Sequence, residues 1–521
     1  MATREWRNTF VPVNRIPADV LSLIPTHLSQ GDRFRASFVC RHWRRTFLHN
    51  ATLWSQLDLS KGEVYVKTLL ERTKESALDI TVDGMDPVCI MALLPPHAQQ
   101  IRFLDFVCDY WVDIIQRFSG VNSGPLSLLT TLRITAVDDV TLEEPDDMTP
   151  RSPSLSLFTH AINLKEFFLH SDGSLSLRHF RFPNLTTFEL SAVPEDDFHA
   201  SQLLDFLEAS PMLRTVDMKV ITDIVLEGVP RERIVVLPNV ETFRLAMRNG
   251  GHGYEIAAHI SCPSARNTSL IHETYTNRVL FQEIFPSSVS WNAIVRQYAR
   301  SPVEGVTLEM RIGSDHAITC SLAFRSSDAT ITRLDFKVAA SHGYGGDFLE
   351  MYCEAFSHAS RTIRDHPLLA NVKRLCFNHS YYSFDYTQRR RIANDVGQLF
   401  KSVGPLEELT LNGCDLRSYL IPFLDHPEPY DIEQPVAFPI VKKLKISHPV
   451  PISCGECATI IVRLAKSQHA LGVPFERVTV HMEENPPGMV VALGRWVGSV
   501  GFCAVFYEGD PLDYCKDRLN T

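Results

Sequence analysis

The sequence predicts an α/β protein in which a small three-helix module is followed by a solenoid of strand and helix units. Two observations predict this fold. Residues 14–60 have the apolar spacing of short helices, and beyond residue 60 one pattern recurs, in which an apolar residue is followed by others three and five positions later. We therefore expect a tail at 1–13, a helical module at 14–60 and a repeat domain at 61–521.

The composition is that of an ordinary globular protein, with 45% hydrophobic and 21% charged residues. The net charge is -10, yet residues 1–60 hold eight Arg and no Lys against four acids, which leaves about -14 on the remainder. A body this acidic repels a phosphate backbone, so we expect no nucleic-acid partner. The N-terminus lacks a continuous apolar stretch and Arg495 interrupts the most hydrophobic later segment, so we expect no membrane association.

The twelve cysteines have no paired spacings typical of a disulfide framework. We therefore expect small buried thiols in a reducing compartment, which means a cytoplasmic or nuclear protein. Cys454-Gly-Glu-Cys457 is the only CxxC motif, and no second pair completes a zinc site. No phosphate loop, nucleophile elbow or kinase signature occurs, so we expect neither an enzyme nor a cofactor.

The module begins at Pro17, which suits a helix start because its missing N–H costs nothing there. Its first apolar residues fall close to one helical face, Gly31-Asp32 then breaks the pattern, and Asp32 is predicted to cap a second helix with Phe34 and Trp43. A third turn follows Asn50 and ends in Leu53-Trp54. So small a domain is expected to leave apolar groups exposed for a partner.

This order of residues, with Val39-Cys40-Arg41-His42-Trp43 and the closing Leu53-Trp54, resembles the F-box motif over residues 14–58. The resemblance implies docking onto a Skp-type adaptor and through it a cullin, while the rest of the chain selects proteins for ubiquitination. By motif position the implied adaptor contacts, some of which must form the module's own core, are Ile16, Pro17, Val20, Leu21, Ile24, Leu28, Val39, Cys40, Trp43, Leu53 and Trp54.

Pro25 departs from the motif, because a proline inside a helix removes a hydrogen bond and bends it. Two other interpretations of the module remain open. It could be an unrelated helical bundle, or Arg41, Arg44 and Arg45 could line a DNA-recognition helix, although Trp43 and Phe47 interrupt that basic face.

Copies of the recurring pattern predict short strands whose apolar residues share one face. Helical segments are predicted between or before them at Val64–Leu70, Gln202–Ala209 and Ala458–His469. Such units cannot bury their own faces and must stack. The copies start at Ile101, Leu129, Leu164, Leu185, Leu213, Val240, Val303, Ile331, Val372, Leu406, Val441 and Phe475, with weaker ones near Ala77, Ala265 and Val500.

The copy from Leu406 to Leu416, with Cys414, matches the leucine-rich-repeat consensus. The chain thus resembles a fungal-type F-box protein with an irregular leucine-rich-repeat-like domain, which implies an interrupted horseshoe. A non-repetitive α/β domain is the alternative. If the strands line a concave face, the side chains that project from it and contact a protein substrate are Phe168, His170, Glu189, Asp217, Lys219, Arg244, Asp335, Arg374, Glu408 and Lys443.

The function predicted from these features is that of a substrate-recognition adaptor of an SCF-type ubiquitin ligase. A non-catalytic repeat scaffold that binds proteins without ubiquitination is the alternative. Two acidic, proline-containing segments, Asp138–Pro153 and Asp425–Val436, are predicted to be exposed insertions between strands.

Overall fold

The computed structural model describes residues 16–59, 62–83, 93–108, 126–136, 161–171, 177, 180–192, 198–220, 224–248, 253–275, 303–312, 317–326, 331–339, 348–364, 372–379, 386–413, 420, 439–447, 454–482 and 489–504. The chain forms two compact units, Met1–Val240 with Cys262–Ser264, and Glu241–Ser261 with Ala265–Thr521. Both predicted acidic insertions and the predicted tail lie outside the described residues.

The first unit begins with the helical module, as predicted. It consists of α2 (Ala18–Leu23), the 3₁₀ helix η2 (Ile24–His27), α3 (Gln30–Ser37), α4 (Arg41–His49) and the 3₁₀ helix η3 (Ala51–Trp54). The short strand β1 (Gln56–Asp58) and helix α5 (Glu63–Thr73) follow, and α5 contains the predicted helix at Val64–Leu70.

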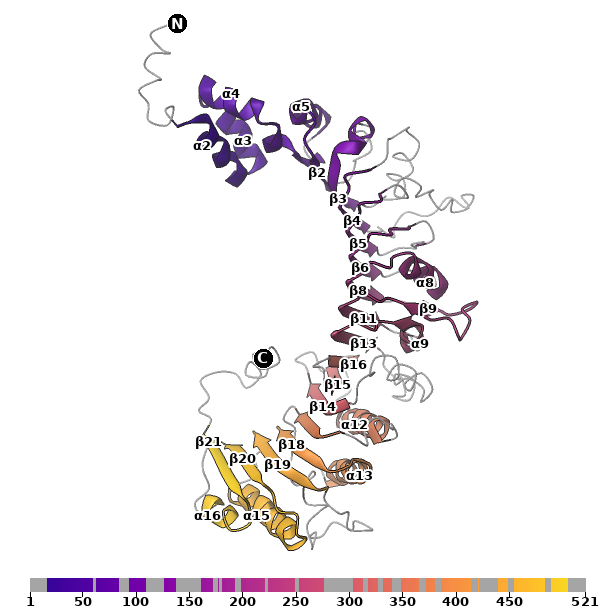
Figure 1. Cartoon of the computed structure of the whole chain (residues 1–521), viewed down its shortest axis with the longest axis vertical. Helices are drawn as coiled ribbons and strands as arrows, with labels where there is room; N and C mark the ends of the chain where they lie inside the picture. Colours follow the sequence, from indigo (N-terminus) through magenta and orange to yellow (C-terminus); the bar gives the residue numbers. More distant parts are fainter. Residues whose placement is uncertain are drawn as a thin grey trace. The chain divides into compact units, whose positions relative to one another are not determined.

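A parallel sheet makes up the rest of this unit. Strands β1, β2 (Leu78–Asp83), β3 (Ile101–Cys108), β4 (Thr131–Ala136), β5 (Glu166–Ser171), β6 (Thr187–Ala192) and β8 (Thr215–Val220) pair in chain order. Figure 1 shows β2 to β8 side by side, with α8 (Ala200–Glu208) next to them. The 3₁₀ helix η5 (Pro95–Gln100) and the short strands β7 (Phe198–His199), β9 (Ile224–Val225) and β10 (Val235–Val236) complete the unit's described elements.

A phenylalanine cluster fills the interior behind β5 and β6. Phe167 and Phe188 are fully buried and their rings stack at 5.8 Å, while Phe206 on α8 lies 4.6 Å from Phe188. Phe180 and Phe182, from the segment between the two strands, complete the cluster at 5.1 and 5.3 Å from Phe167. Rings at these separations add attraction beyond the burial of their area.

The turns that precede the strands are joined by a second set of contacts, a ladder of side-chain hydrogen bonds. The Asn163 amide donates to Ser127 O at 2.6 Å and Asn184 donates to Ile162 O at 2.7 Å. Two further rungs run from Asn239 to Pro211 O at 3.0 Å and from Ser264 to Pro238 O at 2.6 Å. Each donor stands one residue before the first apolar residue of a predicted copy, so these four turns make equivalent contacts.

The second unit contains a mixed sheet. Its described strands are β11 (Thr242–Arg248), β12 (Ile260–Ser261), β13 (Asn267–Tyr275), β14 (Val303–Ile312), β15 (Ala317–Ser326), β16 (Ile331–Ala339), β17 (Arg374–His379), β18 (Leu406–Asn412), β19 (Val441–Ser447), β20 (Arg477–Met482) and β21 (Ser499–Ala504). The helices are α9 (Gly253–Ala258), α12 (Phe348–Arg364), α13 (Tyr386–Ser402), α15 (Cys454–Ala470) and α16 (Met489–Leu493). Helix α15 contains the predicted helix at Ala458–His469. In the first unit, α8 covers all but the last residue of the predicted helix at Gln202–Ala209.

Three strands of this unit interrupt the parallel order. Strand β13 pairs in parallel with β16, β16 pairs antiparallel with β15, β15 pairs antiparallel with β14, and β14 pairs in parallel with β17. Chain order and sheet order are therefore reversed across β14, β15 and β16. From β17 to β21 the strands are again parallel and in chain order.

A strand begins within two residues of the start of every predicted copy, so the recurring pattern correctly located the strands. The apolar residues of the pattern are buried, as in Leu104 and Phe106 of β3 or Leu444 and Ile446 of β19. Strand β15 was not predicted. Cys414, which completes the best-matching copy, lies outside the described residues.

Candidate interaction surfaces

The core of the helical module is built by three of the predicted adaptor contacts. Leu21, Leu53 and Trp54 are at most 3% exposed, so in the free chain they face the interior of the module. Trp54 also donates its indole N–H to Phe47 O at 2.9 Å, and Phe47 is itself fully buried. A buried tryptophan of this kind needs such an acceptor.

A second group of the predicted contacts is exposed. Pro17 is exposed at the start of α2, Val20 is 47% exposed on α2, and Val39 is 58% exposed between α3 and α4. Two larger apolar side chains beside them, Leu23 at 62% and Phe38 at 67%, are also exposed and were not predicted. Leu23 lies three residues after Val20, a spacing that places both on one helical face and that could have revealed it.

The remaining predicted contacts are half-buried. The start of α4 lies beside the residue that leads into α2, because His42 Nε2 is 3.2 Å from Ile16 O. Trp43 packs against Phe47 with ring centroids 5.6 Å apart, and its buried indole N–H has no hydrogen-bond partner within the described part of the chain. This half-buried group consists of Ile16, Ile24, Leu28, Cys40 and Trp43.

The local structure around Pro25 and Asp32 corrects two predictions. The first α-helix ends at Leu23, and Pro25 lies in the first turn of η2, where no intrahelical N–H is required. Pro25 therefore does not lie inside a continuous α-helix and does not bend one, as the sequence had suggested. Ser29, not Asp32, caps α3, and its hydroxyl accepts from Asp32 N at 3.2 Å. Asp32 lies in the first turn, and its carboxylate accepts a hydrogen bond from Ser29 Oγ at 2.7 Å.

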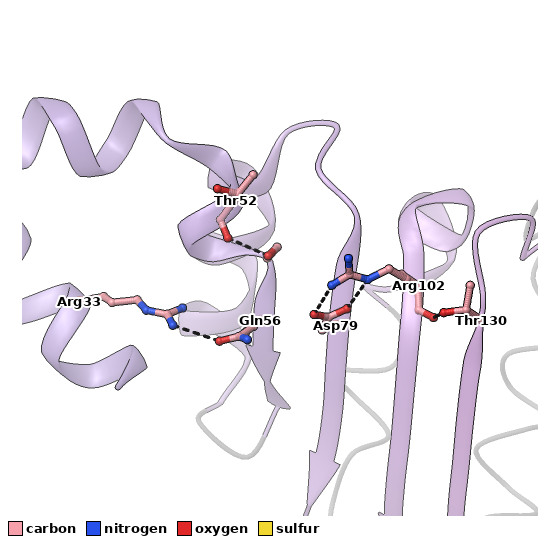
Figure 2. Close-up of polar contacts among 7 residues, drawn as sticks. Arg33, Thr52, Gln56, Asp79, Arg102 and Thr130 are labelled. Atoms are coloured by element: carbon pink, nitrogen blue, oxygen red, sulfur yellow. Dashed lines mark hydrogen bonds and ion pairs between the residues drawn. The ribbon is translucent and has the colours of Figure 1, made fainter. Parts of the chain in front are cut away.

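Arg33 is the buried polar centre of the module, only 7% exposed. Its guanidinium donates to Pro25 O at 2.8 Å, Leu53 O at 2.9 Å and Gln56 Oε1 at 3.1 Å. Figure 2 shows the contact with Gln56, which lies on β1. Burial lowers the pKa of Arg33. One side chain thus links η2, η3 and the first strand of the sheet.

Helix α5 is held to the module by stacked side chains. The Arg72 guanidinium lies 4.8 Å from the ring centroids of both Phe34 and Trp54, and Phe34 also contacts Tyr65 at 4.9 Å. Burial lowers the pKa of Arg72, and the nearby Arg44 charge adds to the shift. Because β1 also pairs with β2, the module joins the sheet through hydrogen bonds and packed rings.

The polar face of the first sheet carries the predicted substrate contacts in aligned rows. Phe168 on β5 is in register with Glu189 on β6, and Glu189 with Asp217 on β8. On the other side of Phe168 lies Arg133, whose guanidinium is 4.6 Å from the Phe168 ring centroid. His170 Nε2 is 3.8 Å from a Glu189 oxygen, and Lys219 is exposed on β8.

Acids outnumber cations on this face. Asp79 on β2 and Arg102 on β3 form a bidentate pair at 2.7 and 3.0 Å, which Figure 2 shows. The described acids are Asp58, Asp79, Asp105, Glu166, Glu189 and Asp217, against Arg102, Arg133 and Lys219. The first sheet therefore presents a negative surface.

In the second unit the corresponding predicted contacts fall on several strands. Arg374 on β17, Glu408 on β18 and Lys443 on β19 are consecutive register partners, so these three lie in one row. Arg244 is exposed on β11. Asp335 lies on β16, in register with Ser321 on β15, and its side chain is outside the described part of the structure.

Arg41, Arg44 and Arg45, considered above as DNA contacts, are exposed on α4. Arg44 lies over the Phe38 ring at 5.5 Å, which directs it toward the apolar residues at the start of α4. Among the described residues, no helix has the length and apolar character to cross a membrane, and no group of three or more His, Cys, Asp or Glu side chains is placed to hold a metal ion.

Comparison with known families agrees with this geometry. Residues 13–60 match the F-box-like family model, a range that starts in the undescribed tail, covers α2 through η3 and ends after β1. No curated protein matches the chain. The match supports an F-box protein whose N-terminal module is an F-box-like domain.

Proposed function

We propose that the chain is a substrate-recognition adaptor of an SCF-type ubiquitin ligase. In this proposal the F-box-like domain binds a Skp-type adaptor, which connects it to a cullin, and the two sheets bind a protein to be ubiquitinated. F-box domains generally bind Skp-type adaptors. No residue of the chain performs chemistry, and the protein works in the cytoplasm or nucleus.

The observation that carries the proposal is the set of exposed apolar side chains on the module. Val20, Leu23, Phe38 and Val39 are each 47% or more exposed, although the module has a filled core of its own. Large exposed apolar groups on a small domain mark a protein interface more often than a catalytic site. They lie within the residues that match the F-box-like family.

We also propose that the strand units form an irregular leucine-rich-repeat-like solenoid of the fungal type. The equivalent hydrogen bonds from Asn163, Asn184 and Asn239 to the preceding turns favour stacked units over a non-repetitive domain. Arg33 binds Gln56 on β1 and Arg72 on α5 stacks on Trp54, and these contacts then fix the orientation of the F-box relative to the first sheet. A tether of this kind raises the concentration of a bound substrate near the ligase.

The test is capture of the purified chain by an immobilised Skp-type adaptor. We compare the wild type with Val20→Glu/Phe38→Ala, which changes exposed side chains only, and with Ile162→Glu, a control at an apolar residue that is 56% exposed in the turn before β5. We expect the wild type and the control to be captured equally and the double variant at least tenfold less. Failure of the wild type to bind, or equal binding of the double variant, would overturn the proposal.

Capture alone does not separate a ligase adaptor from a scaffold. Ubiquitination of co-purified proteins, measured in cells with the wild type and the double variant, makes that distinction. A scaffold binds the same proteins without changing their turnover.

A further inference from the structure

The polar face of β17 to β20 carries four cations and one acid among its described side chains. Arg374 on β17, Lys443 and Lys445 on β19 and Arg477 on β20 are the cations, and Glu408 on β18 is the acid. We call these four cations the basic face. The sign is opposite to that of the polar face of the first sheet.

The pairing of the strands fixes how the cations are spaced. Arg374, Glu408, Lys443 and Arg477 are successive register partners, so they form one row across four strands. Strands lie about 4.8 Å apart and residues two positions apart on a strand about 6.8 Å. Lys443, Lys445 and Arg477 therefore surround one small area, and the full row extends about 14 Å.

Two cations at the edge of the sheet where these strands begin are, in contrast, paired with carboxylates. Lys373, before β17, lies 3.8 Å from a Glu304 oxygen and 3.9 Å from a Glu407 oxygen, and Lys442 lies 3.9 Å from Glu476. Within the part of the chain that the structure describes, no carboxylate forms an ion pair with the four residues of the basic face. The two edge cations are therefore paired with carboxylates, whereas the four cations of the basic face have no such partner among the described residues.

The neighbouring strand has no side chain beside this cluster, and Thr479 and Arg477 fill the place that one would occupy. A Cβ atom added at Gly501 on β21 would lie 3.3 Å from Thr479 Oγ1 and 3.6 Å from Arg477 Nη2. A guanidinium and a hydroxyl group therefore lie over a residue without a side chain. Thr479 is also in register with Lys445, so two cations and a hydroxyl donor converge on one area.

We propose that the basic face binds an acidic segment of a protein partner. A row about 14 Å long matches four or five residues of extended chain at about 3.3 Å per residue, so several carboxylates can meet cations at once. Arginine and lysine clusters recognise such segments through charge-assisted hydrogen bonds. The proposal names the class of substrate and thus rests on the proposed function. The net charge of -10 disfavours non-specific binding of an acidic peptide elsewhere.

The experiment measures fluorescence anisotropy of labelled peptides with the purified full chain. The probes are an extended peptide of alternating Glu and Gly, its Lys counterpart, and a neutral peptide with one phosphoserine. We compare the wild type with Lys443→Gln/Arg477→Gln and with the control Lys373→Gln/Lys442→Gln, which removes the same charge from the strand edges.

We expect the acidic peptide to bind the wild type, to bind the face variant at least tenfold more weakly, and to bind the edge variant within twofold of the wild type. Raising the salt from 50 to 300 mM should weaken binding markedly, because the contacts are ionic. Equal losses in both variants, or no binding of the acidic peptide, overturn the proposal. Tighter binding of the phosphoserine peptide overturns the role of the row and points to a single phosphate site.

This result is independent of adaptor capture. Val20→Glu/Phe38→Ala should retain peptide binding, because its changes lie on the F-box-like domain. Loss of adaptor capture with intact peptide binding, or the reverse, shows which of the two proposals fails.

Discussion

Arg33 gives the sharpest test of how the F-box-like domain is held together. It donates three hydrogen bonds at 2.8, 2.9 and 3.1 Å, two of them to main-chain carbonyls. Hydrogen bonds from a charged group contribute about 1.5 kcal/mol each, and release of the buried guanidinium to water returns part of that total. We therefore expect Arg33→Met, which keeps much of the side-chain volume, to destabilise the domain by about 3 kcal/mol.

The measurement is hydrogen exchange of the amides in η2, α3 and η3, followed by mass spectrometry of the full chain. A loss of about 3 kcal/mol corresponds to exchange roughly a hundredfold faster. Arg35→Met is the matched control, because Arg35 lies on the same helix, is 85% exposed and, among the described residues, forms an ion pair with Asp32 alone. If the two variants exchange at similar rates, the reasoning about Arg33 is wrong.

Three further predictions follow from the packing and the buried groups. Phe206→Ala removes a ring from the phenylalanine cluster and should lower the free energy of unfolding of the first unit by about 3–5 kcal/mol in urea titrations, whereas Phe168→Ala on the polar face should cost under about 1.5 kcal/mol. Burial, with the charges of Glu309 and Glu408, raises the pKa of Cys376 from 9.0 to about 12. In the native protein near pH 8, Cys376 should therefore be alkylated about a thousandfold more slowly than an ordinary thiol, and fast labelling of its peptide would contradict this. Burial also raises the pKa of Asp395, although Ser357 donates to it and Arg391 lies nearby; the folded state then binds the proton more tightly than the unfolded state, so stability should fall as the pH rises above 3.8 and through the raised pKa. Asp395→Asn should reduce that fall, and an unchanged difference in urea midpoint between pH 4 and pH 7 would contradict the prediction.

The positions of the strands could be predicted because most of the copies bury apolar residues at the three positions of the pattern. In β3 these are Ile101, Leu104 and Phe106, all at most 3% exposed. Strand β15 escaped prediction because its core residues, Cys320, Leu322 and Phe324, alternate without the initial residue three positions earlier.

The module was predicted in outline, but the roles of its residues were not. Leu21 and Val20 are adjacent in the same helical pattern, yet one is fully buried and the other 47% exposed, because packing against α4 decides which side faces inward. The cap was placed at Asp32 because Gly31 breaks the apolar spacing; Ser29, three residues earlier, forms the reciprocal contact that the sequence Ser-x-x-Asp also permits. Arg374 and Lys443 were predicted as substrate contacts, but their grouping with Lys445 and Arg477 in one basic face was not, since it depends on which strands are neighbours.

The reversed order of β14, β15 and β16 affects how the second unit can be assembled. Strand β13 is covered by β16, which is synthesised only after β14 and β15, so the sheet cannot grow by adding each new strand to the previous one. The hairpins of β14 to β16 form from local contacts, so these three strands can pair with one another before β16 docks on β13. Until the ribosome has released β16, the edge of β13 remains open to other chains. We expect this stage of synthesis to be where the protein depends most on chaperones.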